Sequence, residues 1–461
     1  MAKKAELLVG LDIGTSRVAA VVAELVPGAN LSIIGCRTAA ATAPTGHSSV
    51  GRMAKKPELL VGLDIGTAKV AAVVGELAPS GTLTVVGFGA APNEGLRRGV
   101  VVNMEATVQA IASAVKEAEL RAGCEIHSVH ASVGGGHIKG FNSHGVVAIK
   151  SGEVVPSDVD RVLDAARAVA LPMDQDILHV LPQEFLVDGQ DGIKEPVGMS
   201  GVRLEARVHI ISTPIAAAQN VIKCCQRAGL HVADLVFAPF AAAEATLSPE
   251  ERELGVAVVE IGAGTTGLLA FAGGAVKHTA VLSVGGNHVS SDIAAGLRTP
   301  FREAEQLKRR FGAALASVVP PGETIEVPTV GGRAPRELSR RILAEIIEPR
   351  MDEIFALVQR QLIRCGLDTA LTSGIVLTGG SVMMDGVVGL AERVFQLPVR
   401  LGTAVACDGI DETLASAAYA AAIGLTRYGG EPHGHLPGLV EDAHLLNRVR
   451  RRMVGWLKEL M

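Results

Sequence analysis

Two glycine-rich turns about 200 residues apart constrain the fold of this chain more than any other feature. The first lies in VGLDIGTAKVAAVV (61–74) and the second in VVEIGAGTTGLLAF (258–271). In each, an apolar run leads to an acidic residue, a Gly/Thr turn and a second apolar run, which is the pattern of a β-hairpin. Backbone amides and hydroxyls in such turns can cradle phosphate oxygens. The pair therefore predicts two similar α/β domains that face each other across a nucleotide cleft.

The turns supply a set of candidate ligands for a nucleotide and its metal. Asp64 and Glu260 precede the glycines, where a hydrated Mg²⁺ would lie, so we predict that both hold the metal through water. No other catalytic candidate is apparent. A third turn, GIVLTGGS (374–381), is expected to approach the ribose and adenine. The predicted nucleotide-binding residues of the three turns are Gly66, Thr67, Ala68, Lys69, Gly262, Gly264, Thr265, Thr266, Gly379, Gly380 and Ser381.

Each of these residues also has a structural interpretation. Asp64 could cap its own turn, and Lys69 could be a lysine at a strand edge that faces solvent. The turn at 379–381 could simply join a strand to a helix. One such turn is a weak signal, but three in this order favour the nucleotide cleft.

Composition narrows the class of protein. The 461 residues suffice for two or three domains, and 48% hydrophobic with 20% charged residues is typical of a globular chain. A net charge of −5 predicts no nucleic-acid partner. The six cysteines form no CxxC pair, which favours buried thiols in a reducing cytosol. Asp12 interrupts the first apolar run, so no signal peptide is expected, and no stretch approaches the ~20 apolar residues of a spanning helix.

The N-terminus contains a direct repeat. Residues 1–25 match residues 53–77 at 21 of 25 positions, and the similarity fades into an Ala/Thr/Ser linker at 38–52. Only the second copy leads into a predicted helix, at 102–123, with Asn103 as its N-cap and Gly123 after its end. The phosphate turn is therefore assigned to the second copy.

The first copy has no helix to cover its apolar strands, and a small sheet alone is marginal. One interpretation is a recent tandem duplication, or a true start at Met53. The other is a decoy set of strands that could replace the second copy in the sheet.

The remaining pattern predicts the domain boundaries. Helices are expected at 215–228, 302–312, 337–366 and 412–425, and another one is expected after an N-cap at Ser157. The predicted parts are a partial repeat and linker (1–52), a first domain (53–133, 213–254 and 412–428), an inserted α+β subdomain (134–212), a second domain (255–411, with a small subdomain near 285–350), a linker (429–446) and a terminal helix (447–461).

The terminal helix is predicted to be amphipathic. A basic helix with a Trp/Leu face is typical of a segment that lies in a membrane interface, where each cation adds ~1 kcal/mol near anionic lipid. The alternative is a helix that packs back on the body, which the preceding Gly/Pro linker disfavours. The predicted membrane-facing residues are Val449, Met453, Trp456, Leu457 and Leu460, with Arg450, Arg451, Arg452 and Lys458 as the basic residues.

Several motifs of residues 53–461 resemble the FtsA family of bacterial cell-division proteins, within the actin/sugar-kinase/heat-shock-chaperone superfamily. They are GLDIGTAKVAAVVGE, PQEF followed by GIKEPVGMSGVR, ERELGVAVVEIGAGTT, SDIA with REAEQLK, VPTVGGRAPRELSRRILAEIIEPR and GIVLTGGS. The resemblance implies an actin-like two-domain ATPase fold with an inserted α+β subdomain and a C-terminal amphipathic helix. It also implies ATP and Mg²⁺ as ligands, filament formation, and a peripheral place on the cytoplasmic face of the membrane at the division site. The implied partners are the tubulin-like protein FtsZ and later septal proteins.

The resemblance assigns further residues. Glu305 and Lys308 are implied to hold the adenosine, as a Glu-x-x-Lys pair does in the chaperone branch; the alternative is a solvated ion pair. A basic cluster in the small subdomain is implied to bind the acidic C-terminal peptide of FtsZ, because arginine binds carboxylates bidentately. A solvated helix start is the other interpretation of that cluster, which is Arg333, Arg336, Arg340 and Arg341.

The second turn departs from the family pattern Asp-Ile-Gly-Gly-Gly-Thr. Glu260 is one methylene longer than Asp, and Ala263 carries a Cβ where glycine would tolerate a positive φ. We therefore predict at most slow ATP hydrolysis and mainly a structural, recruiting role.

The sequence leaves two rival functions open. A kinase of the same superfamily needs a carboxylate base at its acceptor hydroxyl, and only Asp64 and Glu260, which the metal would occupy, are available. An actin-like adaptor of another envelope machine is disfavoured by VGGRAPREL and by the terminal helix.

Overall fold

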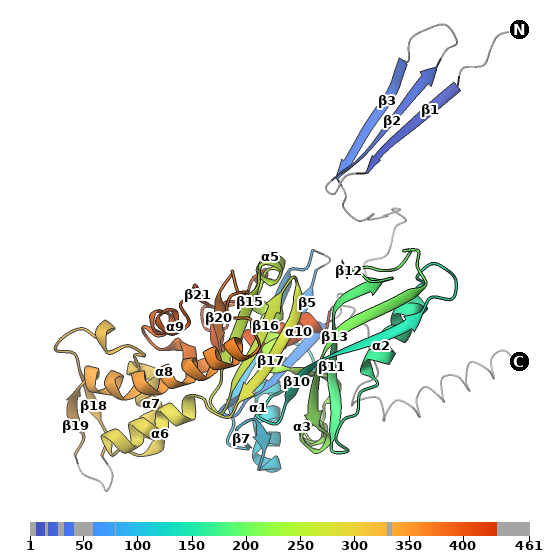
Figure 1. Cartoon of the computed structure of the whole chain (residues 1–461). Helices are drawn as coiled ribbons and strands as arrows, with labels where there is room; N and C mark the ends of the chain where they lie inside the picture. The colour runs from blue at the N-terminus through green and yellow to red at the C-terminus, as the bar shows by residue number, and fades with distance from the viewer. Residues whose placement is uncertain are drawn as a thin grey trace, which may run out of the picture. The chain divides into compact units, whose positions relative to one another are not determined.

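The computed structural model describes residues 6–13, 17–25, 32–40, 59–78, 80–329 and 334–430 (Figure 1). The chain forms two compact units, residues 1–56 and residues 57–461. The terminal helix predicted at 447–461 lies outside the described residues, as does Arg333 of the predicted basic cluster.

The first unit is a three-stranded antiparallel sheet in the order β1-β2-β3. Its strands are β1 (Glu6–Ile13), β2 (Arg17–Leu25) and β3 (Ser32–Ala40). Asp12 pairs with Ala19 here, as Asp64 pairs with Ala71 in the second copy. The irregularity between Val22 and Ala23 also recurs 52 residues later. The sequence repeat is therefore a structural repeat, with the same pairing register.

The second unit begins with a mixed six-stranded sheet in the order β14-β9-β4-β5-β6-β22. Strands β4 to β6 are antiparallel, while β9, β14 and β22 run parallel to their neighbours. The strands are β4 (Leu59–Ile65), β5 (Lys69–Leu77), β6 (Leu83–Pro92), β9 (Ser128–Val133), β14 (His231–Phe237) and β22 (Cys407–Asp408). The chain thus returns to this sheet before residue 412, earlier than the predicted boundary.

Helices cover both faces of this sheet, which explains why β5 is apolar along its length. Alternate residues of β5 point to opposite faces: Val70, Ala72 and Val74 pack in one buried cluster, and Ala71 and Val73 in another. The first cluster includes α1 (Met104–Ala122) and α3 (Ile215–Arg227); the second includes residues of α4 (Ala238–Thr246) and α10 (Ala420–Tyr428).

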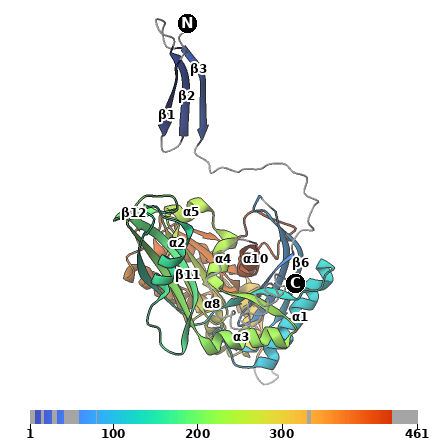
Figure 2. The same cartoon turned by 90° about the vertical axis from the view of Figure 1, so that its right-hand side faces the viewer.

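The predicted ends of α1 are confirmed. The Asn103 side chain accepts a hydrogen bond from the amide of Ala106, and Gly123 adopts a left-handed conformation after the helix. On the other face, α4 and α10 lie side by side (Figure 2). A Cβ on Gly424 of α10 would lie 1.7 Å from the carbonyl oxygen of Ala241, so this contact requires glycine.

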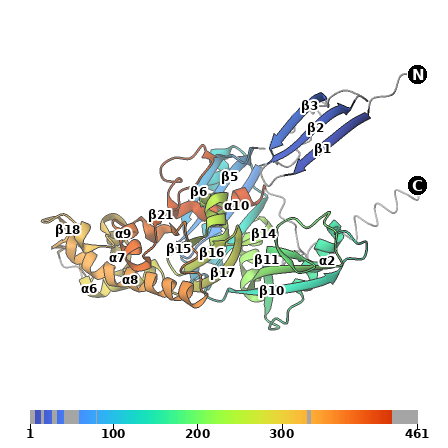
Figure 3. The same ribbon diagram turned by 45° about the horizontal axis from the view of Figure 1, so that its top comes forward.

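The inserted subdomain is an antiparallel sheet in the order β10-β13-β11-β12 with one helix, α2. Figure 3 shows β10 and β11 beside β17 of the second domain, and each of them contacts β17. The insert consists of β10 (Lys139–Ala148), α2 (Pro156–Arg167), β11 (Gln175–Val187), β12 (Gln190–Ile193) and β13 (Arg203–Pro214).

The predicted N-cap at Ser157 is wrong. Pro156 occupies the first turn of α2, a position that suits proline because its missing amide would have no helical partner. Val155 is the residue before the helix, and its amide donates to the Asp158 carboxylate at 3.1 Å.

The second domain contains a five-stranded sheet in the order β17-β16-β15-β20-β21. Its strands are β15 (Val256–Ile261), β16 (Thr266–Ala272), β17 (Ala275–Leu282), β20 (Ile375–Thr378) and β21 (Val399–Leu401). Its helices are α5 (Pro249–Leu254), α6 (Gly286–Leu297), α7 (Phe301–Phe311), α8 (Arg340–Arg364) and α9 (Val387–Phe395). The shorter elements of this domain and of the first are the hairpin β7 (Leu96–Arg97) and β8 (Val100–Val101), the pair β18 (Thr324–Val327) and β19 (Arg336–Ser339), and the 3₁₀ turns η1 (Ala316–Val318), η2 (Gly380–Met383) and η3 (Ala417–Tyr419).

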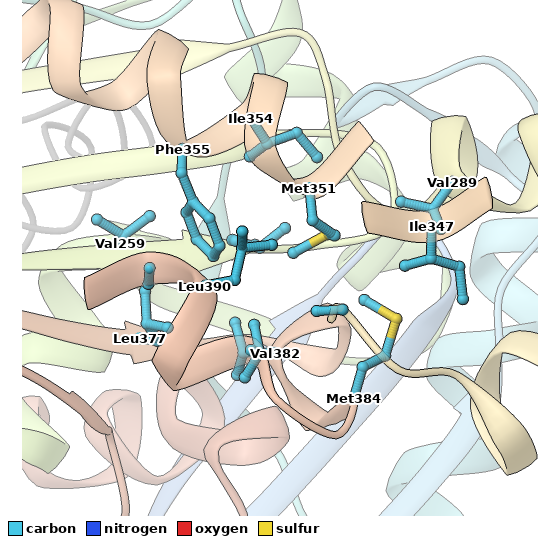
Figure 4. Close-up of a cluster of buried hydrophobic side chains, with 14 of the residues drawn as sticks. Val259, Val289, Ile347, Met351, Ile354, Phe355, Leu377, Val382, Met384 and Leu390 are labelled. Carbon is cyan, nitrogen blue, oxygen red and sulfur yellow. The ribbon is translucent and has the colours of Figure 1, made fainter. Parts of the chain in front are cut away.

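The largest buried cluster of this domain packs α8 and α9 against the sheet. Figure 4 shows Met351 and Phe355 of α8 together with Leu377, Val382 and Leu390. Met384 belongs to the same cluster and also lines the cleft described below. The hydrophobic core therefore reaches the wall of the cleft directly.

Two predicted helices have different bounds. The helix expected at 337–366 begins only at Arg340, because residues 336–339 form β19 and pair with β18. The helix expected at 412–425 begins at Ala420 and continues to Tyr428. Residues 417–419 form the separate turn η3, and this difference matters for the cleft.

Candidate phosphate-binding cleft

The first and second glycine-rich turns lie on opposite sides of one cavity of about 570 Å³. The first turn joins β4 to β5, and the second joins β15 to β16. The predicted residues that line the cavity are Asp64, Gly66, Thr67, Ala68, Lys69, Glu260, Gly262, Gly264, Thr265, Glu305, Lys308, Gly379, Gly380 and Ser381. Residues far apart in the sequence thus meet where the turn pattern places them.

Thr266 is the exception among the predicted ligands. It is fully buried outside the cavity lining, and its hydroxyl donates to the carbonyl of Val284 at 2.8 Å. Because side chains alternate along a strand, this first residue of β16 points away from the cleft while Thr265 lines it.

The two turns have matching geometry. The amide of Gly66 donates to the carbonyl of Lys69, and the amide of Gly262 donates to that of Thr265, each at 2.9 Å. Within the described residues, the amides between them donate to no protein acceptor: those of Thr67, Ala68, Ala263 and Gly264. A row of unpaired amides at the tip of each turn suits an anion with many oxygens.

The turns also approach each other closely at Gly264. A Cβ at this position would lie 2.8 Å from the Thr67 hydroxyl and 2.9 Å from the Arg98 Cα. The neighbouring Ala263 has no positive φ, so it carries no backbone strain in this structure. The expected penalty for alanine at that position is therefore absent.

Two carboxylates face the cavity, one from each domain. The Ser132 hydroxyl donates to Asp64 at 2.7 Å and accepts from the amide of Ile65 at 2.8 Å. Burial raises the pKa of Asp64, against the effects of Ser132 and Lys69. Burial also raises the pKa of Glu260 to about 8, and the charge of Asp64 adds to that rise. Both carboxylates thus lack full compensation for their charge.

This pair fits a hydrated Mg²⁺. Oxygen ligands suit the ion, which keeps much of its own water, and a divalent cation would offset the cost of two half-buried carboxylates. The two carboxylates would have to share the ion with water, because among the described residues no cluster of three or more His, Cys, Asp or Glu side chains could hold a metal.

Lys69 does not face solvent as the structural interpretation expected. Its ammonium donates to the carbonyl of Ala418 at 2.7 Å and lies 3.3 Å from the centre of the Tyr419 ring. Burial lowers the pKa of Lys69 to about 8, although Asp64 and Glu260 oppose this change. The residue is a half-buried cation beside the phosphate turn.

Glu305 and Lys308 on α7 form an ion pair of 2.6 Å, but not a solvated one. Lys308 is 5% exposed. Its ammonium donates to Glu305, to the Ser290 hydroxyl at 3.0 Å and to the Gly286 carbonyl at 3.0 Å. These three bonds use all three of its protons, so Glu305 is the member of the pair with an oxygen left for a ligand.

The third turn brings backbone against the second turn. Gly379 has a φ of 90°, and a Cβ there would lie 2.5 Å from the carbonyl oxygen of Ile261. The Ser381 hydroxyl donates to the carbonyl of Gly262 at 3.2 Å. Glycine at 379 therefore follows from both its conformation and this close approach.

Sequence reasoning missed several residues of the cleft. Ser132 belongs to no motif and Ser290 directly precedes SDIA, and only the fold brings them to Asp64 and Glu305. Ala418 and Tyr419 fell inside a predicted helix. No local pattern in the sequence marks either residue as part of the cleft.

The basic cluster predicted to bind a partner is divided by the structure. Arg340 is largely buried and pairs with Glu323 at 3.1 Å and with Asp385. Arg336 donates to the carbonyl of Leu297, while Arg341 is exposed and pairs with Glu345 at 3.2 Å. Arg340 therefore has carboxylate partners within the chain, and its place in a partner-binding surface stays a prediction.

In the part of the chain that the structure describes, no helix has the length and apolar character needed to cross a membrane.

Family models match two segments of the chain. A model described as "SHS2 domain inserted in FTSA" matches residues 135–212, and one described as "Cell division protein FtsA" matches residues 257–424. The first range coincides with the insert, one residue after its predicted start at 134.

Curated proteins and solved structures give the same result. The chain is 51% identical to the cell division protein FtsA of Pseudomonas aeruginosa, over 81% of this chain and 89% of that one. It is 42% identical to the cell division protein FtsA of Escherichia coli, over 87% and 96%. A structure of a PilM–PilN type IV pilus biogenesis complex has a similar fold, with a TM-score of 0.58 and 19% identity over 81% of this chain and 99% of that one. These findings confirm the resemblance and the actin-like α/β fold with its insert.

Proposed function

Because the chain belongs to the FtsA family of cell-division proteins, we propose that it binds ATP with Mg²⁺ in this cleft and links FtsZ to the membrane. In this proposal it acts on the cytoplasmic face at the division site, assembles into actin-like filaments and recruits later septal proteins. Hydrolysis is slow at most, and the nucleotide serves to control assembly.

One observation carries the nucleotide part of the proposal. The two glycine-rich turns, the two carboxylates and Lys69 all line a single cavity between the two domains. If the DIGT and EIGAGT turns were ordinary β-turns, we would not expect both of them to line the same cavity. A cavity of about 570 Å³ is also within the range of ~300–1,000 Å³ that small-molecule sites occupy.

Different residues of the cleft would bind different parts of Mg·ATP. The free amides of the first two turns would hold the phosphates, and Lys69 would add a positive charge there. Glu305, fixed by Lys308 and Ser290, has an oxygen for a ribose hydroxyl. Mg²⁺, when bound, would neutralise phosphate charge, with Asp64 and Glu260 holding its waters.

The membrane and FtsZ parts of the proposal rest on the family and the sequence. The terminal residues 447–461 combine a basic stripe with a Trp/Leu face, and one such helix would bind anionic lipid weakly and reversibly. Filament formation would multiply that attachment by avidity. The candidates for the acidic peptide of FtsZ stay Arg333, Arg336, Arg340 and Arg341, although the last two pair with carboxylates of this chain.

The direct test is calorimetry of ATP binding to the full chain, with and without Mg²⁺. We expect binding that requires Mg²⁺ and that falls at least tenfold in Lys69→Met, since one charged hydrogen bond to phosphate contributes ~1.5–3 kcal/mol. Arg341→Met is the matched control, because it removes an exposed cation that does not line the cavity. Equal losses in both variants, or no ATP binding by the wild type, would refute the cleft assignment.

The membrane part has its own test. The full chain and a version that ends at Leu446 are sedimented with anionic liposomes, with the single Trp456 as a fluorescence probe. Pelleting with a blue-shifted spectrum that is lost on truncation is expected. A full chain that stays in the supernatant would leave a soluble actin-fold ATPase or kinase as the better description.

A further inference from the structure

Lys69 is held by a segment 349 residues further along the chain. The carbonyl of Ala418 accepts a hydrogen bond from its ammonium, and the ring of Tyr419 faces the same ammonium at 3.3 Å. A cation over an aromatic face gains electrostatic energy, most of all away from water. Both partners line the cavity, so the contact lies inside the proposed site.

The segment that holds Lys69 is itself fixed from both domains. The carbonyl of Ala417 accepts from the amide of Gly379, in the third turn of the second domain, at 2.9 Å. The Tyr419 ring packs edge-on against Phe88 of β6, in the first domain, with ring centres 5.0 Å apart. The segment that ends at Tyr419 thus contacts both domains and forms a platform under the ammonium, and α10 begins directly after it.

Lys69 shares its cavity with two carboxylates but pairs with neither. Among the described residues, no salt bridge joins its ammonium to Asp64 or Glu260, although their charges affect its pKa. A lysine that closed on those carboxylates would occupy the place of the metal ion and would withdraw its charge from the phosphates. Binding of both the metal and the phosphates therefore requires that the Lys69 ammonium be held away from the two carboxylates.

We propose that Tyr419, together with the carbonyl of Ala418, is the positioning residue that holds Lys69 off Asp64 and Glu260 and ready for a nucleotide phosphate. This inference rests on the proposed nucleotide site and adds to it a residue outside the three glycine-rich turns. In this arrangement the two carboxylates stay available to bind the metal, and the Lys69 ammonium stays available to bind the phosphates.

The first test compares Tyr419→Leu with Tyr419→Phe in the full chain. Leucine removes the aromatic face, whereas phenylalanine keeps it and removes only the hydroxyl. For Tyr419→Leu we expect about tenfold weaker Mg·ATP binding, which corresponds to a cation–π contribution of ~1.4 kcal/mol. We also expect a higher Mg²⁺ concentration for half-maximal ATP binding, because Lys69 then competes for the carboxylates. Adenosine binding and the Tyr419→Phe variant should stay within about twofold of wild type.

A merely structural role of Tyr419 predicts a different pattern. General loosening of η3 would weaken adenosine as much as ATP and would leave the Mg²⁺ requirement unchanged. Either result would overturn the proposal. The loss should also vanish in a Lys69→Met background, because Tyr419 then has no cation to position; a loss that persists there would equally refute it.

A second measurement does not depend on nucleotide. Thermal unfolding of the wild type, Lys69→Met, Tyr419→Leu and the double variant forms a double-mutant cycle without ligand. If the ring holds the ammonium, the two shifts in melting temperature are not additive. Additive shifts would overturn the positioning role even if ATP binds. Absence of ATP binding together with non-additive shifts would instead reject the proposed nucleotide function and keep the Lys69–Tyr419 contact.

Discussion

The two copies of the N-terminal repeat have the same strands in the same register, yet only the second becomes part of a domain. β1 to β3 and β4 to β6 pair residue for residue at an offset of 52, including the irregularity after Val22 and Val74. Near-identical local sequence thus produces the same meander twice. The difference lies in what packs on it, because only the second copy is followed by α1 and its apolar face.

The residue that marks this difference is Gly89. A Cβ there would lie 2.1 Å from the carbonyl oxygen of Ala114 and 2.7 Å from the amide of Ala118, both in α1. The first copy has Arg37 at the corresponding position. Pairing register is therefore encoded within the repeat, but docking of a helix requires a glycine that the first copy lacks. This argues against the hypothesis that the first copy replaces the second in the sheet.

The largest expected effect comes from making the second copy like the first at this position. Gly89→Arg should prevent α1 from docking and unfold the first domain, a loss of more than about 4 kcal/mol, because the clash is with helix backbone that cannot rotate away. Circular dichroism and thermal unfolding measure it. The control is Thr84→Ser, an exposed position in β6 that also takes its first-copy residue and should change stability by less than ~0.5 kcal/mol. A Gly89→Arg protein that melts like wild type would show that α1 does not decide the difference.

The next effect is on the phosphate turn, where the first copy has Arg17 in place of Lys69. Lys69→Arg puts a larger, permanently charged group over Tyr419, so we expect about tenfold weaker ATP binding. Calorimetry at pH 7 measures this loss, and unchanged affinity would contradict the fit of lysine to its platform.

The same substitution predicts a pH effect with a definite sign. Burial lowers the pKa of Lys69 from 10.5 to about 8, so between these values the unfolded chain binds more protons than the folded one. Stability from this group therefore rises with pH across that window, by on the order of 3 kcal/mol, and is lost as pH falls through 8. Arginine does not titrate there. The melting temperature of wild type relative to Lys69→Arg should thus increase from pH 8 to pH 10, and a constant difference would refute the depressed pKa.

These residues also show what the sequence could and could not predict. The glycine-rich turns identified the cleft because turn chemistry is local, and the ends of α1 followed from Asn103 and Gly123. Thr266 was misassigned because one residue along a strand changes the face on which a side chain lies. The ion pairs of Arg340 could not be predicted, because its carboxylate partners, Glu323 and Asp385, are distant in the sequence.

Tyr419 could not be assigned to Lys69 from any pattern. The small residues around it predicted a continuous helix, and only the packing of η3 between the two domains places its ring in the cleft. Contacts of this kind depend on tertiary structure, which overrides local propensity.

A smaller effect is expected at Gly75, where the first copy has Ala23. A Cβ at Gly75 would lie 2.9 Å from the end of the Leu83 side chain and 3.1 Å from the carbonyl oxygen of Thr84. Because a leucine side chain can move, Gly75→Ala should cost only ~1–2 kcal/mol. Thermal unfolding measures this, and a cost as large as that of Gly89→Arg would mean that strand packing, rather than helix docking, distinguishes the copies.

The smallest effect is expected from deletion of residues 1–52. They belong to one compact unit and residues 57–461 to another, and every residue that lines the cleft lies between Asp64 and Tyr419. The main unfolding transition and the ATP affinity should therefore stay within experimental error, while a three-stranded sheet on its own adds little stability. A deletion that lowered the melting temperature by several degrees would show that the first copy packs on the rest of the protein.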